Sequence, residues 1–560
     1  MNADLDTALR TSFGFSAFRP GQAEAIQSLL GGRHTLVVMP TGAGKSLVYQ
    51  LAALQRPGVT LVISPLIALM HDQVTSLVRR RIPATFINST LDLPEQNRRL
   101  GCLARGDYRL VYVAPERLRN APFLDALSRV DVDFLAVDEA HCISQWGHDF
   151  RPDYLQIGSA RARMKNPVTA ALTATATPRV QDDIVRLLGL GPAERIITGF
   201  NRPNLCFEVR YAPDLSSKFQ VLKELLAELD GGAAIVYAGT RRDAEEVAEF
   251  TRTVVRVNAG YYHGGLDAEI RTSVQNEFLA GDLPVVVATN AFGMGIDRAD
   301  VRLVAHHTVP GTLESYYQEA GRAGRDGEPA RAVLIYATQD RALQEWFIEC
   351  DLTTADDLRA LYRALGSQPR EGVRITSDEL SLATGFHQVK VKLGLAQLEI
   401  GGAIERLGDE GARMQVRVNR WDEIVMQKVV ADKESRRRFR LDQLDDMVAY
   451  AESNSCRRRI LLAHFGDESE PDAAKCCDNC AVTDVHPVED APDESTDVAH
   501  IILDTLSTLK WEVGQGKLAG LLVGQRQLLR TYYYNAAYPG SDSRAAVTSK
   551  KAWTSTWPCK

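Results

Sequence analysis

Short apolar segments rich in β-branched residues alternate with helical patterns along the first 350 residues. One series runs from Leu36 to about Leu190, and a second begins near Gly232. Strands that alternate with helices in this way form parallel sheets with helices on both faces. We therefore predict an α/β protein with two tandem parallel-sheet domains, residues 1–203 and 204–350, joined around FNRPN. The strand candidates are LVVM, TLVISP, LVYVAP, FLAVDEAH and TAALTATAT, then AAIVYAG, VNAGYYHG, PVVVATN, VRLVAHH and AVLIYAT.

After about Asp351 the pattern becomes helical and more basic, and a chain of 560 residues is in any case too long for one core. Within the predicted region 351–430, residues 373–420 contain two or three helices and a short β-wing, which indicates a helix-turn-helix-like module or a plain helical insertion. Residues 431–484 are expected to form a helical module with clustered cysteines, and residues 485–560 begin with an acidic linker.

The composition is that of an ordinary globular protein, with 45% hydrophobic and 24% charged residues. The sequence contains neither an 18-residue apolar run nor the pattern of an export signal, so we expect no membrane association and a cytoplasmic location. A net charge of -7 argues against binding nucleic acid by overall attraction. Clefts focus local fields, however, so the net charge does not exclude nucleic acid as a partner.

A phosphate-binding loop is predicted where the strand LVVM leads into PTGAGKS and then into a helical pattern. Glycines let backbone N–H groups turn toward phosphate oxygens, Lys45 can meet the terminal phosphates, and Ser46 can hold Mg²⁺. Met39 stands where the strict pattern has glycine, so a simple glycine-rich turn is the alternative. The residues expected to bind ATP here are Thr41, Gly42, Gly44, Lys45 and Ser46.

Two carboxylates end the apolar strand FLAV about a hundred residues further on. Asp138 would hold Mg²⁺ and Glu139 would orient or deprotonate the attacking water, as phosphoryl transfer requires. Carboxylates also follow strands by chance on protein surfaces, but seldom in the same predicted sheet as a phosphate loop.

The second domain offers a third part of such a site in the sequence YYQEAGRAGR. Arg322 and Arg325, three residues apart on one predicted helical face, could reach across a cleft and neutralise charge that develops on the γ-phosphate. Gln318 precedes them on the same helix. The alternative is a helix that carries exposed arginines.

Taken together, PTGAGKS, DEAH, TATAT and QEAGRAGRDG resemble superfamily 2 helicases, whose two domains are RecA-like. Further stretches resemble the RecQ family of ATP-dependent DNA helicases over roughly residues 5 to 340. These are LRTSFGFSAFRPGQ, SPLIALMHDQV, HCISQWGHDFRPDY and VVVATNAFGMGIDRADVR.

The resemblance implies roles around the nucleotide. In the family the FRPGQ segment recognises adenine, which suits the donor and acceptor of the Gln22 amide, with Phe15 and Arg19 available to stack or pair. Asp297, in GMGID, would help to join the nucleotide site to the path of the strand.

The segment HCISQWGHDF resembles the family's aromatic-rich loop, which couples contact with a single strand to ATP hydrolysis. Trp146 and Phe150 offer faces on which a base could stack, and His148 and Arg151 offer polar contacts. The alternative for Trp146 is burial in the core. Further candidates for phosphate contacts at strand ends are Ser64, Thr173, Thr175, Arg241, His263 and Thr289.

Four of the nine cysteines cluster as a single cysteine followed by CCDNC, which resembles the zinc module of the family. Four thiolates form a closed structural zinc site. Because two of the cysteines are adjacent, His464 or Asp478 could replace one of them. The expected Zn²⁺ ligands are Cys456, Cys476, Cys477 and Cys480.

By this resemblance, residues 351–430 are an atypical insertion before the zinc module, and the chain ends in a shortened winged-helix-like region within 485–560. The implied function is that of an ATP- and Mg²⁺-dependent 3′ to 5′ DNA helicase of recombination and repair. Its partners would be single-stranded, forked or branched DNA and repair or single-strand-binding proteins, at the nucleoid if the source is bacterial. An RNA helicase, or a DNA-stimulated ATPase that translocates with little unwinding, are the alternatives.

Overall fold

The computed structural model describes residues 2–88, 90–147, 149–229, 231–293, 298–350, 353–366, 370–410, 413–469 and 476–481. These residues all belong to one compact unit, Met1–Val482. The acidic linker and winged-helix-like end expected within 485–560 lie outside the described residues.

The first domain is built on a seven-stranded, wholly parallel sheet in the order β3-β4-β2-β5-β6-β1-β7. Successive residues of a strand face opposite sides of a sheet. Accordingly, Leu36 and Val38 enter one apolar core while Val37 enters the other. The strands are β1 (Thr35–Val38), β2 (Val59–Ile63), β3 (Ala84–Ile87), β4 (Leu110–Val113), β5 (Val132–Val137), β6 (Val168–Thr173) and β7 (Glu194–Ile197).

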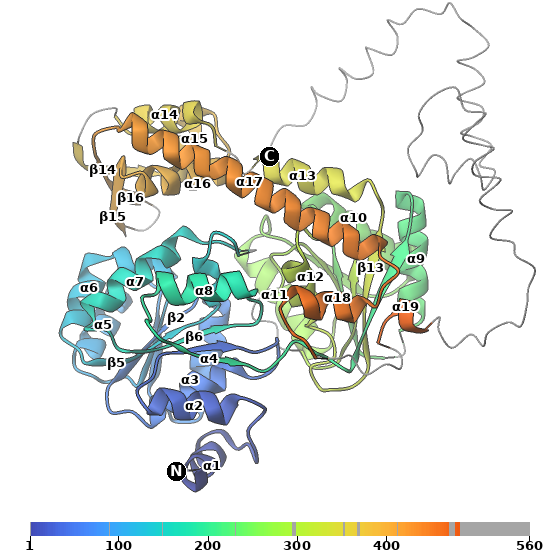
Figure 1. Ribbon diagram of the computed structural model, residues 1–560, viewed down its shortest axis with the longest axis horizontal. Coiled ribbons are helices and arrows are strands. Elements are labelled where there is room, and N and C mark those ends of the chain that lie inside the picture. Colours follow the sequence, from blue (N-terminus) through green and yellow to red (C-terminus); the bar gives the residue numbers. More distant parts are fainter. Residues whose placement is uncertain are drawn as a thin grey trace, which may run out of the picture. The chain divides into compact units, whose positions relative to one another are not determined.

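Helices cover this sheet, as the blue to cyan ribbons of Figure 1 show. They are α1 (Asn2–Phe13), α2 (Gln22–Leu30), α3 (Lys45–Leu54), α4 (Ile67–Arg79), α5 (Leu93–Ala104), α6 (Ala121–Ser128), α7 (Gln156–Arg163) and α8 (Pro178–Leu187). Short 3₁₀ turns are η1 (Pro115–Arg119), η2 (Ala140–Ile143) and η3 (Pro152–Leu155).

The second domain has a six-stranded parallel sheet in the order β10-β11-β9-β12-β13-β8. Its presence confirms the prediction of two tandem parallel-sheet domains. The strands are β8 (Leu205–Tyr211), β9 (Ala233–Tyr237), β10 (Ala259–Tyr262), β11 (Val285–Ala288), β12 (Val301–His306) and β13 (Ala330–Tyr336). The helices are α9 (Leu215–Ala227), α10 (Arg241–Phe250), the π-turn η4 (Thr251–Val255), α11 (Ala268–Ala280), α12 (Leu313–Ala320) and α13 (Asp340–Cys350).

A small module follows, with three helices and an antiparallel sheet in the order β14-β16-β15. It has an apolar core of its own, to which Leu358, Leu398 and Val416 contribute. Its elements are α14 (Ala355–Ala364), β14 (Arg370–Thr376), α15 (Ser377–Thr384), α16 (Gln388–Ile400), β15 (Ile404–Glu410) and β16 (Arg413–Val418).

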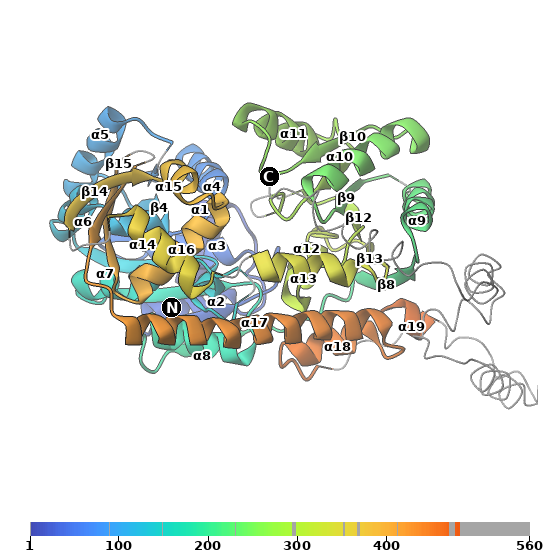
Figure 2. The ribbon, with the colours of Figure 1, turned by 90° about the horizontal axis from the view of Figure 1, so that it is seen from above.

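The helix α17 (Glu423–Glu452) connects this module to the cysteine-bearing segment. It is continuous across residues 430 and 431, where we expected one module to pass into the next (Figure 2). Met426 belongs to the core of the small module, whereas Met447 and Tyr450 belong to the core shared by the parallel-sheet domains. One helix therefore serves two cores. It is followed by α18 (Arg457–His464) and α19 (Asp478–Ala481).

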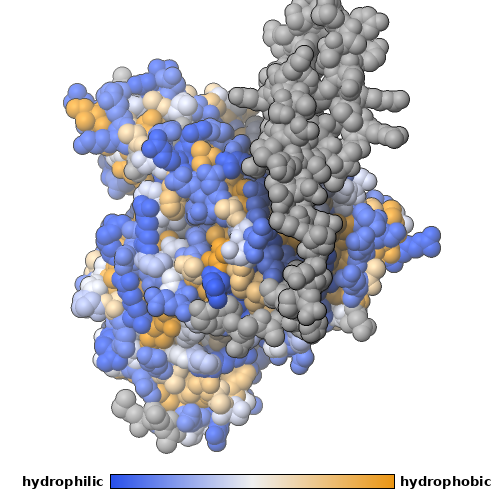
Figure 3. Space-filling view, turned by 45° about the vertical axis from the view of Figure 1, so that its right-hand side comes forward, coloured by the Kyte–Doolittle hydropathy of each residue, from blue (hydrophilic) through white to orange (hydrophobic). Residues whose placement is uncertain are grey.

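No helix in the described part of the chain is long and apolar enough to cross a membrane. On the face drawn in Figure 3, hydrophilic residues predominate and apolar ones are scattered among them.

Candidate nucleotide, nucleic-acid and metal sites

The loop between β1 and α3 adopts a conformation that requires glycine at two positions. Gly42 and Gly44 have φ angles of 83° and 79°, which residues with a Cβ seldom adopt. Neighbouring side chains fill the space that a Cβ would need. A Cβ on Gly44 would lie 2.7 Å from Nε2 of Gln22, and one on Gly42 would lie 3.3 Å from Cγ of Arg325.

Met39, which departs from the strict loop pattern, has no need to be glycine. Its side chain is fully buried in the apolar core beneath the loop. Its carbonyl oxygen faces the loop instead and accepts a hydrogen bond from Lys45 Nζ at 3.1 Å. The positive φ angles of the loop thus fall on the two later glycines, Gly42 and Gly44.

Lys45 begins α3 and is partly buried. Its ammonium donates to the carbonyls of Met39 and Pro40, at 3.1 and 3.4 Å. Burial lowers the pKa of Lys45, and the negative charges of Glu139 and Asp138 oppose that shift. An anion in the loop would supply the opposite charge that the carbonyls lack.

Asp138 and Glu139 end β5 beside this loop. Burial, and then the charge of Glu139, raise the pKa of Asp138, whereas Lys45 lowers it. Glu139 has a left-handed backbone (φ 46°, ψ 47°), a costly conformation for a residue with a Cβ and one that is enriched at functional sites. Its Oε2 is buried and accepts no hydrogen bond. Two neighbouring carboxylates with an unsatisfied oxygen suit a divalent cation or a water held for attack.

The residues expected around adenine lie against the same loop. Nε2 of Gln22 donates to the carbonyls of Ala43 and Gly44 at 3.0 and 3.1 Å, and its Oε1 accepts from the Arg19 backbone N–H at 2.8 Å. The Arg19 guanidinium donates to the carbonyl of Gly42. Phe15 is half exposed. Thus Gln22 and Arg19 hold the loop itself, and Asp297 lies outside the described residues.

The expectation that Arg322 and Arg325 share a helical face is wrong. Helix α12 ends at Ala320, and both arginines lie in the turn that follows. The reason is the glycine-rich sequence, since Gly324 has a φ of 57° that continues no helix. Arg322 is buried and donates to the carbonyl of Gly293. The side chain of Arg325 approaches Gly42, and its charge contributes to the lowered pKa of Lys45.

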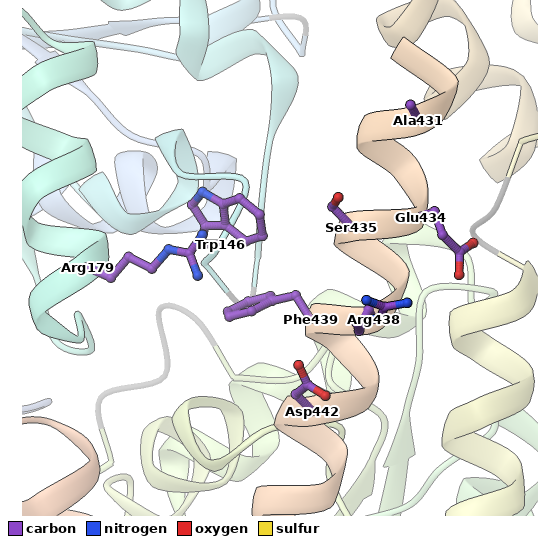
Figure 4. Close-up of a pocket in the computed structure, with 8 residues that line it drawn as sticks. All are labelled: Trp146, Arg179, Ala431, Glu434, Ser435, Arg438, Phe439 and Asp442. Carbon is purple, nitrogen blue, oxygen red and sulfur yellow. The ribbon is translucent and has the colours of Figure 1, made fainter. Parts of the chain in front are cut away.

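Trp146 lies in the loop after η2 and packs against two side chains that we did not single out from the sequence (Figure 4). The Arg179 guanidinium lies 3.7 Å from the centroid of the indole, and the Phe439 ring, on α17, meets it edge-on at 4.9 Å. A cavity of about 460 Å³ opens here, lined by Trp146, Arg179, Ala431, Glu434, Ser435, Arg438, Phe439 and Asp442. Trp146 is therefore partly buried, and its ring contacts both Arg179 and Phe439.

The other residues of the aromatic-rich loop differ in their surroundings. Arg151 forms an ion pair with Asp149 at 2.9 Å and donates to the carbonyl of Pro65 at 3.3 Å. Phe150 is half-buried. His148 lies outside the described residues.

Most of the candidate phosphate contacts at strand ends are enclosed. Ser64, Thr173 and Thr175 are buried, and Thr173 Oγ1 lies 2.9 Å from Nδ1 of His141. His263 is also buried, with Nε2 2.9 Å from a carboxylate oxygen of Glu245. Of the six candidates, Arg241 is exposed and Thr289 is half-buried.

The four clustered cysteines come together. Sγ of Cys456 lies 3.5 Å from that of Cys476 and 4.0 Å from that of Cys477, and all four sulfurs, including Cys480, lie within 4.8 Å of one another. Tetrahedral zinc with Zn–S bonds of about 2.3 Å separates its sulfurs by about 3.8 Å. The thiol set therefore fits zinc.

The two alternative ligands have other partners. Asp478 accepts hydrogen bonds from Arg457 Nε and the Val209 N–H, both at 2.9 Å. His464 Nε2 lies 3.0 Å from Oε1 of Glu314. The backbone of the adjacent Cys476 and Cys477 runs beside β8, where the Phe207 N–H donates to the Cys476 carbonyl at 3.2 Å.

Three parts of the chain match known protein families. Residues 19–184 match the DEAD/DEAH box helicase family, residues 217–327 the helicase conserved C-terminal domain, and residues 418–481 the RecQ zinc-binding family. The fold resembles that of the DUF1998 helicase MrfA bound to DNA, with a TM-score of 0.52 over 76% of this chain and 63% of that one. At 18% sequence identity that likeness concerns the fold alone. The chain is accordingly a two-domain superfamily 2 helicase.

Closer relatives specify the family. The chain is 36% identical to a probable ATP-dependent DNA helicase RecS of Bacillus subtilis, over 85% of this chain and 92% of that protein. It is 37% identical to the ATP-dependent DNA helicase RecQ of the same organism, over 92% of this chain and 72% of that protein. The chain belongs to the RecQ family of ATP-dependent DNA helicases.

Proposed function

We propose that this helicase uses Mg²⁺ and ATP to move 3′ to 5′ along single-stranded DNA and to unwind forked or branched duplexes in recombination and repair. The observation that carries this proposal is the continuity of one short segment. Glu139 at the hydrolysis site and Trp146 are seven residues apart, with the buried turn η2 between them. If Trp146 moves when it stacks on a base, this short segment would therefore transmit the displacement to Glu139.

His141 adds a second link within that segment. Its Nδ1 lies 3.5 Å from Oε2 of Glu139 and 2.9 Å from Oγ1 of Thr173, at the end of β6. In our proposal Glu139 and the end of β6 thus change position together when a DNA single strand binds. Thr173, Thr175 and Ser64 would gain access to a phosphate only if the two domains change their relative position.

For hydrolysis, the proposed role of Lys45 is to hold the terminal phosphates, and that of Glu139 is to accept a proton from the attacking water. Ser46 and Asp138 would hold Mg²⁺, which neutralises phosphate charge when bound. Gly42, Gly44 and Thr41 supply the backbone of the loop, with Gln22, Arg19 and Phe15 on its adenine side. Arg322 and Arg325, with Gln318, would stabilise charge on the γ-phosphate from the second domain.

For the DNA single strand, we propose that a base stacks on Trp146 or Phe150 and that exposed arginines contact the phosphates. Arg241 is open to solvent at the start of α10, and Arg438 lines the cavity beside Trp146.

For the duplex, the proposed contact is the module of residues 353–418. Its sequence has as many acidic as basic residues, so the shape of the module rather than its charge would have to dominate binding. Repair or single-strand-binding proteins are the proposed protein partners, and DNA as substrate would place the chain at the nucleoid in a bacterial host.

Strand separation tests the proposal directly. We expect ATP- and Mg²⁺-dependent unwinding of a forked DNA duplex with a 3′ tail, little unwinding with only a 5′ tail, and none with EDTA. ATP hydrolysis should respond to DNA single strands and far less to RNA of the same sequence, because the 2′-hydroxyl is sensed by direct contact. DNA-stimulated hydrolysis without strand separation would instead make the chain a translocase, and preference for the 5′ tail would refute the polarity.

A further inference from the structure

The segment FNRPN that joins the two parallel-sheet domains contains an arginine that contacts both halves of the nucleotide site. Arg202 donates from one terminal nitrogen to the carbonyls of Thr41 and Gly321, each at 3.3 Å. Its other terminal nitrogen donates to the carbonyls of Ala323 and Gly324, each at 3.0 Å. Thr41 belongs to the phosphate-binding loop, and the other three belong to the turn that carries the two arginines.

All four partners are backbone carbonyls, so the contact depends on where the two loops run and not on their side chains. The planar guanidinium presents several N–H donors in a fixed geometry, which suits a bridge between two loops. Among the described residues no carboxylate pairs with Arg202. Its position is therefore determined by the phosphate-binding loop on one side and the arginine turn on the other.

The segment around Arg202 is itself held from the zinc module. Arg458, which is buried two residues after the zinc-binding candidate Cys456, donates to the carbonyl of Leu205 at 2.5 Å and contacts the carbonyl of Pro203 at 3.4 Å. Because the backbone is anchored here, the guanidinium of Arg202 approaches the two loops from a fixed direction.

Aromatic contacts hold the other end of the segment. Phe200 stacks on Phe465 with ring centroids 4.4 Å apart and an interplanar angle of 11°, and its N–H donates to Oδ2 of Asp467 at 2.6 Å. The Phe200 carbonyl accepts a hydrogen bond from the hydroxyl of Tyr317, which lies on α12 beside Gln318. The linker is thus fastened on both sides of Arg202.

We propose that Arg202 is a positioning residue for ATP hydrolysis, which sets the arginine turn against the phosphate-binding loop without touching the nucleotide. This inference rests on the proposed roles of Lys45 and of Arg322 and Arg325. Because a misplacement of about 1 Å at a reacting centre can cost about a hundredfold in rate, loss of the bridge should slow turnover far more than it weakens ATP binding.

The test is a comparison of R202A and R202K with the parent chain in steady-state hydrolysis at saturating single-stranded DNA. We expect R202A to lower kcat by about tenfold to a hundredfold, the scale of a small misalignment, while ATP affinity measured with a fluorescent ATP analogue changes by less than about threefold. R202K should fall between them, since a single ammonium cannot span four carbonyls. R195A is the matched control, because Arg195 is an exposed arginine whose ion pair with Asp182, at 2.6 Å, lies on the surface of the first domain.

The following outcomes decide between these possibilities. Unchanged kcat in folded R202A or R202K overturns the inference, as does a loss of ATP affinity equal to the loss of kcat. If R202A does not fold, R202K provides the same comparison. K45A separates this inference from the proposed function: a K45A chain that still hydrolyses ATP refutes the site, whereas inactive K45A together with fully active R202A refutes only the role of Arg202.

Discussion

Two lysines, one in each parallel-sheet domain, are withdrawn from solvent and satisfied in different ways. Lys218 in the second domain is buried, and its Nζ lies 2.6 and 2.7 Å from the two carboxylate oxygens of Asp340. Among the described residues, Nζ of Lys45 in the first domain donates hydrogen bonds only to carbonyl oxygens. Burial lowers the pKa of both; the charges of Glu139 and Asp138 oppose this shift at Lys45 without a direct ion pair, whereas the carboxylate of Asp340 contacts Lys218 directly.

The difference extends to neighbouring groups. In the first domain, Oε2 of Glu139 and the hydroxyls of Ser64 and Thr175 are buried without a hydrogen-bond partner. In the second, Oε2 of Glu319 lies 2.8 Å from Nε2 of His306, whereas Nδ1 of His306, Nε2 of His307 and Nε of Arg322 are buried without a hydrogen-bond partner among the described residues. Buried polar groups are normally satisfied, so unsatisfied ones clustered at the ends of neighbouring strands indicate where a ligand binds. The first domain therefore leaves oxygens unsatisfied at the ends of neighbouring strands, whereas the second leaves ring and guanidinium nitrogens unsatisfied, among them Nε of Arg322.

The largest expected effect is that of K45A. Removing the ammonium should lower DNA-stimulated ATP hydrolysis at least about a thousandfold, the scale of losing a charge that stabilises phosphoryl transfer. The thermal unfolding midpoint should fall less than for K218A, since Lys45 compensates the charges of Asp138 and Glu139 without forming a direct ion pair. K223A, at an exposed position on α9, is the control. Substantial turnover by K45A would remove the distinction between the two lysines.

The opposite result is expected for K218A. It leaves the buried carboxylate of Asp340 without its partner, and breaking a buried pair costs about 3–5 kcal/mol of folding free energy. Denaturant unfolding should report that loss, while kcat of the folded fraction stays within about threefold of the parent. The double variant K218A/D340N should recover part of the stability. A stable but inactive K218A would contradict the structural role.

E139Q tests whether the unsatisfied carboxylate takes part in the reaction. Glutamine preserves shape but accepts no proton, so we expect kcat to fall by about a hundredfold or more, in the range of general base catalysis, with ATP binding retained. Stability should not decrease, because the carboxylate has no hydrogen-bond partner to lose at Oε2. Parent-level turnover would assign activation of water to another group.

The smallest effect is expected for F439A, which removes the ring that α17 places against Trp146. We expect the concentration of single-stranded DNA that half-maximally stimulates hydrolysis to change by about threefold to tenfold, the scale of an aromatic contact of about 1 kcal/mol. Basal hydrolysis should be unchanged. I424A is the matched control, because Ile424 is exposed on the same helix.

A double-variant cycle sharpens this test. If Phe439 acts through Trp146, F439A should have no further effect in a W146A background. Equal effects of F439A with and without Trp146 would show that α17 influences DNA binding by another route.

Much of the fold followed from the sequence because its signals are local. Apolar runs of four to six residues with glycine-rich or carboxylate ends predicted most strands of the parallel sheets but not β3, β7 or β8, and two series of them predicted two sheets. The phosphate-binding loop could be recognised because Gly42 and Gly44 must adopt positive φ. The prediction that Arg322 and Arg325 share a helical face was wrong, because a spacing of three residues is equally compatible with a glycine-rich turn.

The sequence by itself determined which chemical groups are present: a lysine after a glycine loop, two carboxylates after a strand, and four thiols close together. Local order along the chain suffices for these, because each motif is continuous. Only the tertiary structure decided which distant groups meet them. Phe439 reaches Trp146 from almost 300 residues away, and Arg202 bridges two loops separated by about 280 residues. Such contacts depend on how distant segments pack and on where backbone carbonyls lie, and a sequence pattern predicts neither.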